Sequence, residues 1–176
     1  MSKFLTPCFS LLLLVASSAF GQDVHYNFDN TSDFSKFRTY KWIVLNSEAP
    51  IDNLTDEQIK AALEAELSRK GLAKADTDHA DLLIGFQTTE HISEQFGGRD
   101  SPWSVGPAWN GKPDSIRTVY KGEMAVDMYD PANHHLIWRG VASKSLDPKA
   151  SAEKRQKNLD KAVSKLMKDY PPPAPK

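Results

Sequence analysis

The first 21 residues of the chain carry the three features of a cleaved export signal. Lys3 supplies a positive start, residues 9–16 (FSLLLLVA) form a short apolar run, and small residues stand at Ala19 and Gly21. An apolar run this short cannot span a bilayer, which needs about 20 residues, and no later segment comes near that length. We therefore expect residues 1–21 to be removed and the remainder to fold outside the cytoplasm. It is expected to be periplasmic or outer-membrane-associated, with no transmembrane segment.

Removal of this leader leaves about 155 of the 176 residues, enough for one domain that buries about two-thirds of its unfolded surface. The single cysteine is Cys8, inside the leader. The mature chain then has no cysteine, which excludes disulfides, thiolate catalysis and cysteine-bound zinc. We predict one domain over residues 22–170, held together by its hydrophobic core, and a proline-rich tail over residues 171–176.

Cys8 also bears on how the protein is anchored. Lipid attachment to a bacterial envelope protein requires a cysteine directly after the apolar run, where this chain has Gly21 and Gln22. Residues 5–8 (LTPC) resemble a lipidation motif but precede the apolar run. The sequence therefore predicts a product without a lipid anchor.

Two strands and a helix open the predicted domain. Residues 24–28 alternate apolar and polar side chains, as in a half-buried strand, and residues 39–45 (TYKWIVL) are rich in β-branched and aromatic residues. The helix is expected to begin at Thr55, with Gln58 completing a capping box. It is expected to end at Gly71, which suits a left-handed position after a helix. Its apolar stripe consists of Ile59, Ala62, Leu63 and Leu67.

Three strands and a second helix follow. Residues 80–90 (ADLLIGFQTTE) predict a strand buried on both faces. Residues 118–129 and 135–146 predict a hairpin joined by a turn at residues 130–133. The last helix carries apolar residues at helical spacing and ends before the prolines, with the stripe Leu159, Ala162, Val163, Leu166, Met167 and Tyr170.

The predicted order is therefore β-β-α-β-β-β-α. A strand-helix-strand passage favours a parallel crossover, and the three later strands can form an antiparallel meander. Each helix has one apolar stripe and can cover one face of a sheet. The fold class is α+β: a two-layer sandwich with a mixed, mostly antiparallel sheet of about five strands and two helices on one face. Leu83, Ile137 and Val141 fall out of phase with the inward residues, so we expect something to cover the other face.

Several of these segments, taken in order, resemble the bacterial domain-of-unknown-function family 4136. The resemblance rests on five short motifs: residues 40–42 (YKW), 70–72 (KGL), 80–84 (ADLLI), 136–140 (LIWRG) and 170–172 (YPP). It spans nearly the whole mature chain. It implies an envelope protein with no established activity, and many members resemble lipoproteins. This chain departs from the family pattern at the missing lipidation cysteine and at residues 133–135 (NHH), where a glycine-containing turn is common.

A long loop is predicted between two of the strands, over residues 91–117, where glycine and proline are frequent. It carries Phe96, Trp103 and Trp109. Exposed aromatic rings stack on sugars, insert at membrane interfaces or anchor partner proteins. These three residues are the candidate binding site for a ligand or partner, and the alternative is a lid that folds over the uncovered sheet face.

No catalytic set emerges elsewhere. His134 and His135 are adjacent, and neighbours on a strand point to opposite faces, so no metal site is predicted. Residues 151–154 match Ser-x-x-Lys, but its companion motifs are absent and a helix start needs a serine in any case. Glu123 and Asp127 share a strand face, which we assign to solvent. No nucleotide-binding fingerprint is present, and no cofactor is predicted.

The charge balance argues against a nucleic-acid-binding protein. Without Lys3, 21 basic residues face 23 acidic ones, which gives no global attraction to nucleic acid. The basic side chains of the last helix, which could touch anionic lipid or polysaccharide, are assigned to a solvated face.

Three functions remain open. The first is a non-enzymatic envelope protein that binds or scaffolds an envelope protein, glycan or lipid. The second is a small hydrolase of cell-wall or sugar substrates that uses carboxylates. The third is a carrier of an apolar ligand between the sheet and the loop.

Overall fold

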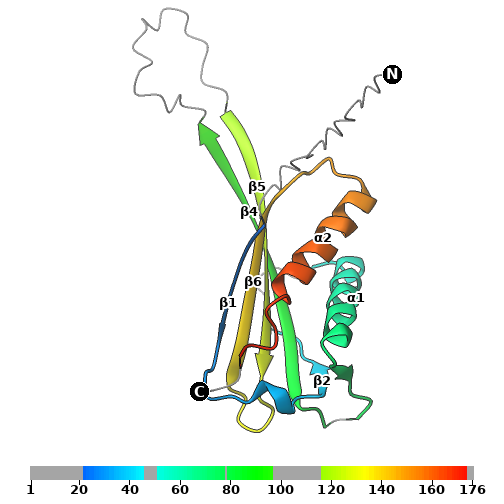
Figure 1. The fold of residues 1–176 in the computed structure, drawn as a ribbon. Coiled ribbons are helices and arrows are strands. Elements are labelled where there is room, and N and C mark those ends of the chain that lie inside the picture. Colours follow the sequence, from blue (N-terminus) through cyan, green and yellow to red (C-terminus); the bar gives the residue numbers. More distant parts are fainter. Residues whose placement is uncertain (1–21, 46–50, 78, 97–115, 174–176) are drawn as a thin grey trace, which may run out of the picture.

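The computed structural model describes residues 22–45, 51–77, 79–96 and 116–173. Within them the chain forms one sheet of six strands in the order β1-β6-β5-β4-β2-β3, with two helices packed on one face (Figure 1). The predicted α+β sandwich is confirmed, with one strand more than expected. The elements are β1 (Asp23–Phe28), β2 (Thr39–Trp42), α1 (Asn53–Arg69), β3 (Ala73–Lys74), β4 (Leu82–Phe96), β5 (Ile116–Tyr129), β6 (Leu136–Leu146) and α2 (Ala152–Leu166).

The topology follows the predicted order. Strand β2 pairs in parallel with β4 after the α1 crossover, and β4, β5 and β6 form an antiparallel meander. Strand β1 closes one edge by antiparallel pairing with β6, and the short β3 extends the other edge next to β2. We call the face covered by the helices the inner face and the opposite one the outer face.

Helix α1 begins earlier than predicted. Its N-cap is Asp52, whose side chain accepts a hydrogen bond from the backbone amide of Thr55 at 3.0 Å, so the predicted start at Thr55 is wrong. Both residue types cap helices well, and capping chemistry alone does not choose between them. The predicted end is confirmed: Gly71 has φ 83°, and the amides of Gly71 and Leu72 donate to the carbonyls of Ser68 and Leu67 in a Schellman motif.

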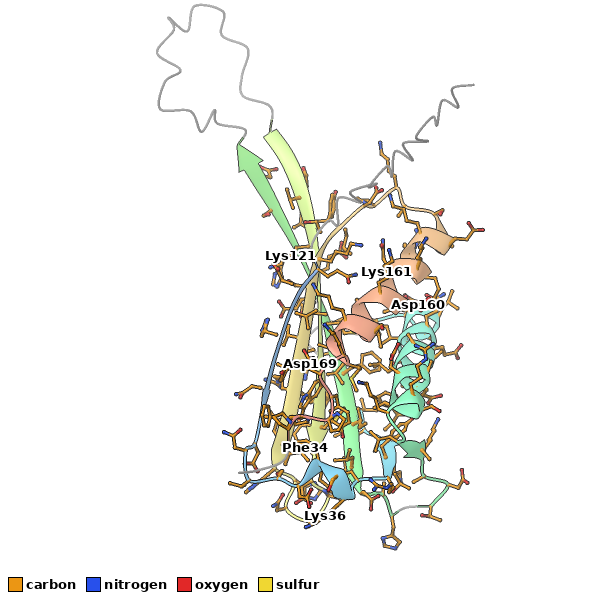
Figure 2. All side chains as sticks on the ribbon, in the orientation of Figure 1. Phe34, Lys36, Lys121, Asp160, Lys161 and Asp169 are labelled. Atoms are coloured by element: carbon orange, nitrogen blue, oxygen red, sulfur yellow. The ribbon has the colours of Figure 1, made fainter. Side chains whose placement is uncertain are left out.

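The core lies between the inner face and the helices. Buried side chains on alternate positions of β4, β5 and β6 meet the predicted stripes of both helices, including Leu82, Ile84, Met128, Trp138, Leu63, Leu67, Val163 and Leu166. At the lower end of Figure 2, Phe34 lies in an aromatic cluster, with edge-to-face contacts to Phe28, Phe37 and Tyr170. These large side chains close that end of the interior.

A carboxylate ties the starts of β2 and β4 together. Asp81 Oδ2 accepts hydrogen bonds from the backbone amides of Arg38 and Thr39, at 2.8 and 2.9 Å, and from the Thr39 hydroxyl at 2.9 Å. The backbone hydrogen bonds from Arg38 and Thr39 hold the pKa of Asp81 below its ordinary value. The aspartate of the ADLLI motif thus fixes where the parallel pair begins.

Replacing Asp81 by alanine should lower the free energy of unfolding by about 1 kcal/mol at pH 7, a modest value because the carboxylate is exposed to water. A group with a lowered folded pKa stabilises above its unfolded pKa, about 3.9 for aspartate, and loses that effect as the pH falls through the folded value. The deficit of Asp81→Ala should therefore shrink below about pH 4. Urea titrations at pH 7 and pH 3 measure it, with the exposed Asp76→Ala as control. A deficit that is equal at both pH values would contradict this account.

Strands β4 and β5 are longer than predicted. The predicted loop over residues 91–117 is wrong at both ends, because residues 91–96 and 116–117 are paired strand. Pairing with β6 stops at Tyr120 and Leu146, so β4 and β5 continue beyond it as a two-stranded ribbon (Figure 1). Ile92 and Tyr120 keep the alternation of apolar side chains there, but the glycines and prolines of residues 97–113 obscure it in the sequence.

The outer face is partly covered from within the chain. A Cβ atom at Gly85 would lie 2.6 Å from Leu45 Cγ, so Leu45 packs directly on the β4 backbone. The pairing of β5 and β6 shifts between Met128 and Tyr129, which leaves Ile137 as an extra residue, and it joins the core. Our assignment of Ile137 to the outer face was therefore wrong, because a bulge breaks the alternation.

Asp127 lies on the outer face but is not solvated. Its side chain is 1% exposed, and its two oxygens accept hydrogen bonds from Arg139 Nε and Nη2, both at 2.6 Å. The prediction that Asp127 belongs to a wet strand face is wrong. Residues 127 and 139 stand directly opposite each other on β5 and β6, and this cross-strand pair shields the carboxylate from water.

Candidate ligand-binding groove

A groove of about 650 Å³ opens between the two helices and the inner face of the sheet. Its floor includes Thr88, Gly122, Met124 and Ala142, from β4, β5 and β6. Ile59 of α1 and Leu159 and Ala162 of α2 form its helical walls. The exposed surface inside it is mainly apolar. We call this space the helix–sheet groove.

The groove exists because the side chains on its floor are small. Further down the same three strands, the inward positions carry Ile84, Met128 and Trp138, which fill the space under the helices. Near the other end the inward positions include Thr88, Gly122 and Ala142, and the Leu146 side chain lies over Gly122. Protein interiors are normally packed without large voids. The smaller side chains at this end leave an open space under the helices that the core does not fill.

One cation lies in the floor of the groove. Lys144 follows Ala142 on the inner side of β6, and its amine donates a hydrogen bond to Asn158 Oδ1 of α2 at 2.6 Å. Burial lowers the pKa of Lys144, and the positive charges of Lys161 and Lys154 lower it further. Figure 2 shows Lys161 on α2, on the side of the molecule away from Phe34. In the described part of the chain, no carboxylate forms an ion pair with Lys144.

The acidic side chains of the walls are partly engaged elsewhere. Asp52 caps α1, and Asp147 pairs with Lys154 at 2.9 Å. Glu90 stands two strands away from Lys144, with Gly122 between them in the register of the sheet. Asp127, which the sequence places on one strand face with Glu123, lies outside the groove and is bound to Arg139. The pair Glu123 and Asp127 therefore offers no free acid and base together.

The residues predicted as a binding site fall beyond the described part of the chain. Trp103 and Trp109 lie outside it, as does the side chain of Phe96, whose backbone ends β4. Their role as a binding surface or a lid stays a prediction. The helix–sheet groove was missed because no motif marks it. Its signal is the small residue found at an inward position on each of three neighbouring strands.

The histidine pair lies in a turn, and the Ser-x-x-Lys motif lies at a helix start. His134 occupies a left-handed turn position with φ 56°, and both it and His135 are exposed. Ser151 caps α2 by accepting a hydrogen bond from the Lys154 amide at 3.3 Å, as predicted for a helix start. The Lys154 amine binds Asp147. Among the described residues, no group of three metal-ligating side chains comes together.

No helix in the described part of the chain is long and apolar enough to cross a membrane. The predicted leader, residues 1–21, lies outside that part.

Solved structures share this fold at low sequence identity. A dodecameric PelC variant from Paraburkholderia phytofirmans is 6% identical with a TM-score of 0.51, over 84% of this chain and 95% of that one. A second PelC dodecamer from the same organism gives a TM-score of 0.50 at 6% identity, over 84% and 96% of the chains. A PDZ domain protein from Parabacteroides distasonis is 17% identical with a TM-score of 0.52, but the match covers 86% of this chain and only 36% of that one. At these identities the likeness is one of fold alone.

No curated protein matches the chain. Residues 24–172, nearly all of the predicted mature domain, match the family described as Domain of unknown function (DUF4136). The resemblance seen in the YKW, ADLLI and LIWRG motifs is thereby confirmed. The chain belongs to the DUF4136 family.

Proposed function

We propose that this protein is an exported, non-enzymatic binding domain of the cell envelope that holds an apolar ligand in the helix–sheet groove. The observation that carries the proposal is the groove itself: about 650 Å³ of space with mainly apolar walls, beside an otherwise filled core. Ligand sites in proteins are typically concave, mostly apolar and about 300–1,000 Å³ in volume.

Of the three functions left open by the sequence, this proposal favours the non-enzymatic binding protein and takes its apolar ligand from the carrier hypothesis. The carrier was expected to hold its ligand between the sheet and the long loop, whereas the groove lies between the sheet and the helices. The hydrolase hypothesis gains no support from Asp127, which is buried in an ion pair. The export itself, the envelope location and the absence of a lipid anchor are proposed on the pattern of residues 1–21.

Filling the groove with a side chain should abolish binding. Thr88 lies on the inner face of β4 and lines the groove, and tryptophan is well tolerated in strands. We expect the fluorescent probe N-phenyl-1-naphthylamine to bind the wild-type protein and to be displaced by dodecanol. The Thr88→Trp variant should bind the probe at least tenfold more weakly, because the indole ring occupies the same space.

The matched control is His91→Trp, an exposed outer-face position on the same strand that does not line the groove. It should bind the probe as the wild type does, and circular dichroism should show both variants folded. Equal binding by the folded Thr88→Trp variant, or no binding by the wild type, would refute the proposed function.

A further inference from the structure

We propose that the ligand of the helix–sheet groove is a single-chain amphiphile whose anionic oxyacid head group, carboxylate or phosphate, binds at Lys144. The inference rests on the proposed function and names the chemical class of its ligand.

Lys144 lies at the boundary between the apolar floor and the open end of the groove. It follows Ala142 and precedes Leu146 on the inner side of β6, and its neighbour across the sheet is Gly122. Gly122 has no side chain, and the Leu146 side chain lies over its backbone, with Cδ1 3.0 Å from where a Cβ atom would be. An alkyl chain lying along Ala142 and Leu159 therefore brings its head group to Lys144.

The amine is held in place but not saturated. Asn158 Oδ1 accepts one hydrogen bond from it at 2.6 Å. An ammonium group has three donors, so two remain for a ligand. A carboxylate or phosphate supplies oxygen acceptors for both, and bonds between ionised partners are about twice as strong as neutral ones. Asn158 thus orients Lys144 from the opposite wall.

The charges that act most strongly on the Lys144 amine are positive. The positive charges of Lys154 and Lys161 on α2 act on Lys144, and Arg155 lines the same wall with its Nη1 donating to the Ala150 carbonyl at 2.7 Å. In the part of the chain that the structure describes, four carboxylates line the groove. Asp52 caps α1, Asp147 is paired with Lys154 and offsets its charge, and Glu123 stands opposite Ser143 in the β5–β6 register. Glu90 is two strand spacings from Lys144, about 10 Å at the backbone.

A partly buried cation is costly for the fold when, as within the described residues here, no counter-ion accompanies it. Burial and the two neighbouring lysines lower the pKa of Lys144, and the negative charge of a bound anion opposes this lowering. Perturbed groups of this kind in a concave site are typical of binding sites.

The test compares three ligands with the same alkyl chain: dodecanoate, dodecyl phosphate and dodecanol, each below its micellar concentration at pH 7.5. Displacement of N-phenyl-1-naphthylamine from the full chain gives the affinities. We expect at least one of the two anions to bind the wild type at least tenfold more tightly than dodecanol. Lys144→Gln, which keeps polarity but not charge, should bring this ratio to about one.

The matched control is Lys157→Gln, which removes an exposed charge of α2 that does not line the groove. It should keep the preference for the anion. Lys144→Arg should also keep it, since the charge is retained. If dodecanol binds as tightly as both anions, or if Lys144→Gln keeps the preference, the inference is wrong while the proposed function stands. If none of the three ligands displaces the probe from the wild type, the proposed function itself fails.

Discussion

Replacing Gly140 by alanine is expected to lower the free energy of unfolding by about 3 kcal/mol, although it adds only one methyl group. A Cβ atom at Gly140 would lie 2.3 Å from Cη2 of Trp138 and 2.7 Å from Cδ1 of Leu166. Trp138 and Leu166 are each 1% exposed, so the packed core leaves them no space to move into. The extra methyl therefore has to displace an indole ring or separate α2 from the sheet.

Thermal or urea unfolding measures this effect, with Gly71→Ala as the matched control. A methyl group at Gly71 would meet no atom of the described residues within 4 Å, but the backbone there has φ 83°. Alanine at this position therefore brings only backbone strain, about 1 kcal/mol. The expected order of stability is wild type, Gly71→Ala, Gly140→Ala. A Gly140→Ala variant as stable as the wild type would show that the indole ring is not packed as described.

The second large effect concerns the ion pair on the outer face. Replacing Arg139 by methionine leaves the carboxylate of Asp127, 1% exposed, without its partner. Breaking a buried pair from one side typically costs 3–5 kcal/mol, and we expect about 3 kcal/mol because the guanidinium is itself 47% exposed. Tyr129, whose hydroxyl donates to Asp127 at 3.3 Å, offers only a weak substitute.

The double variant Asp127→Val with Arg139→Met is the control for this effect. Replacing both members of a buried pair by apolar residues is often neutral, so it should be within about 1 kcal/mol of the wild type in urea unfolding. Valine also suits a strand. If the double variant is less stable than Arg139→Met alone, loss of packing rather than an unpaired charge causes the damage.

Local patterns in the sequence predict much of this fold because they reflect local physics. The apolar stripe of α1 and the Gly71 ending depend on neighbours within one or two turns, and both are confirmed. The predicted start of α1 is wrong because Asp52 and Thr55 are both residue types that cap helices well. The prediction that Asp127 is solvated is wrong because alternation places a residue on a face but does not show that Arg139 will stand opposite it.

The helix–sheet groove needed the register of the whole sheet. Thr88, Gly122 and Ala142 are unremarkable residues 20 to 54 positions apart in the sequence. Only the pairing of β4, β5 and β6 brings them to one floor, and only the α2 position places Asn158 over Lys144. The predicted binding site in the aromatic loop, by contrast, rests on composition, which gives residue types but no geometry.

The central claim is that the groove holds a small ligand, and native mass spectrometry of the protein purified from its own envelope fraction tests it most directly. We predict that the wild type and His91→Trp retain a small molecule that is released on denaturation, and that a folded Thr88→Trp variant does not. A wild-type protein whose native and denatured masses are the same, or a ligand kept equally by Thr88→Trp, would contradict the claim.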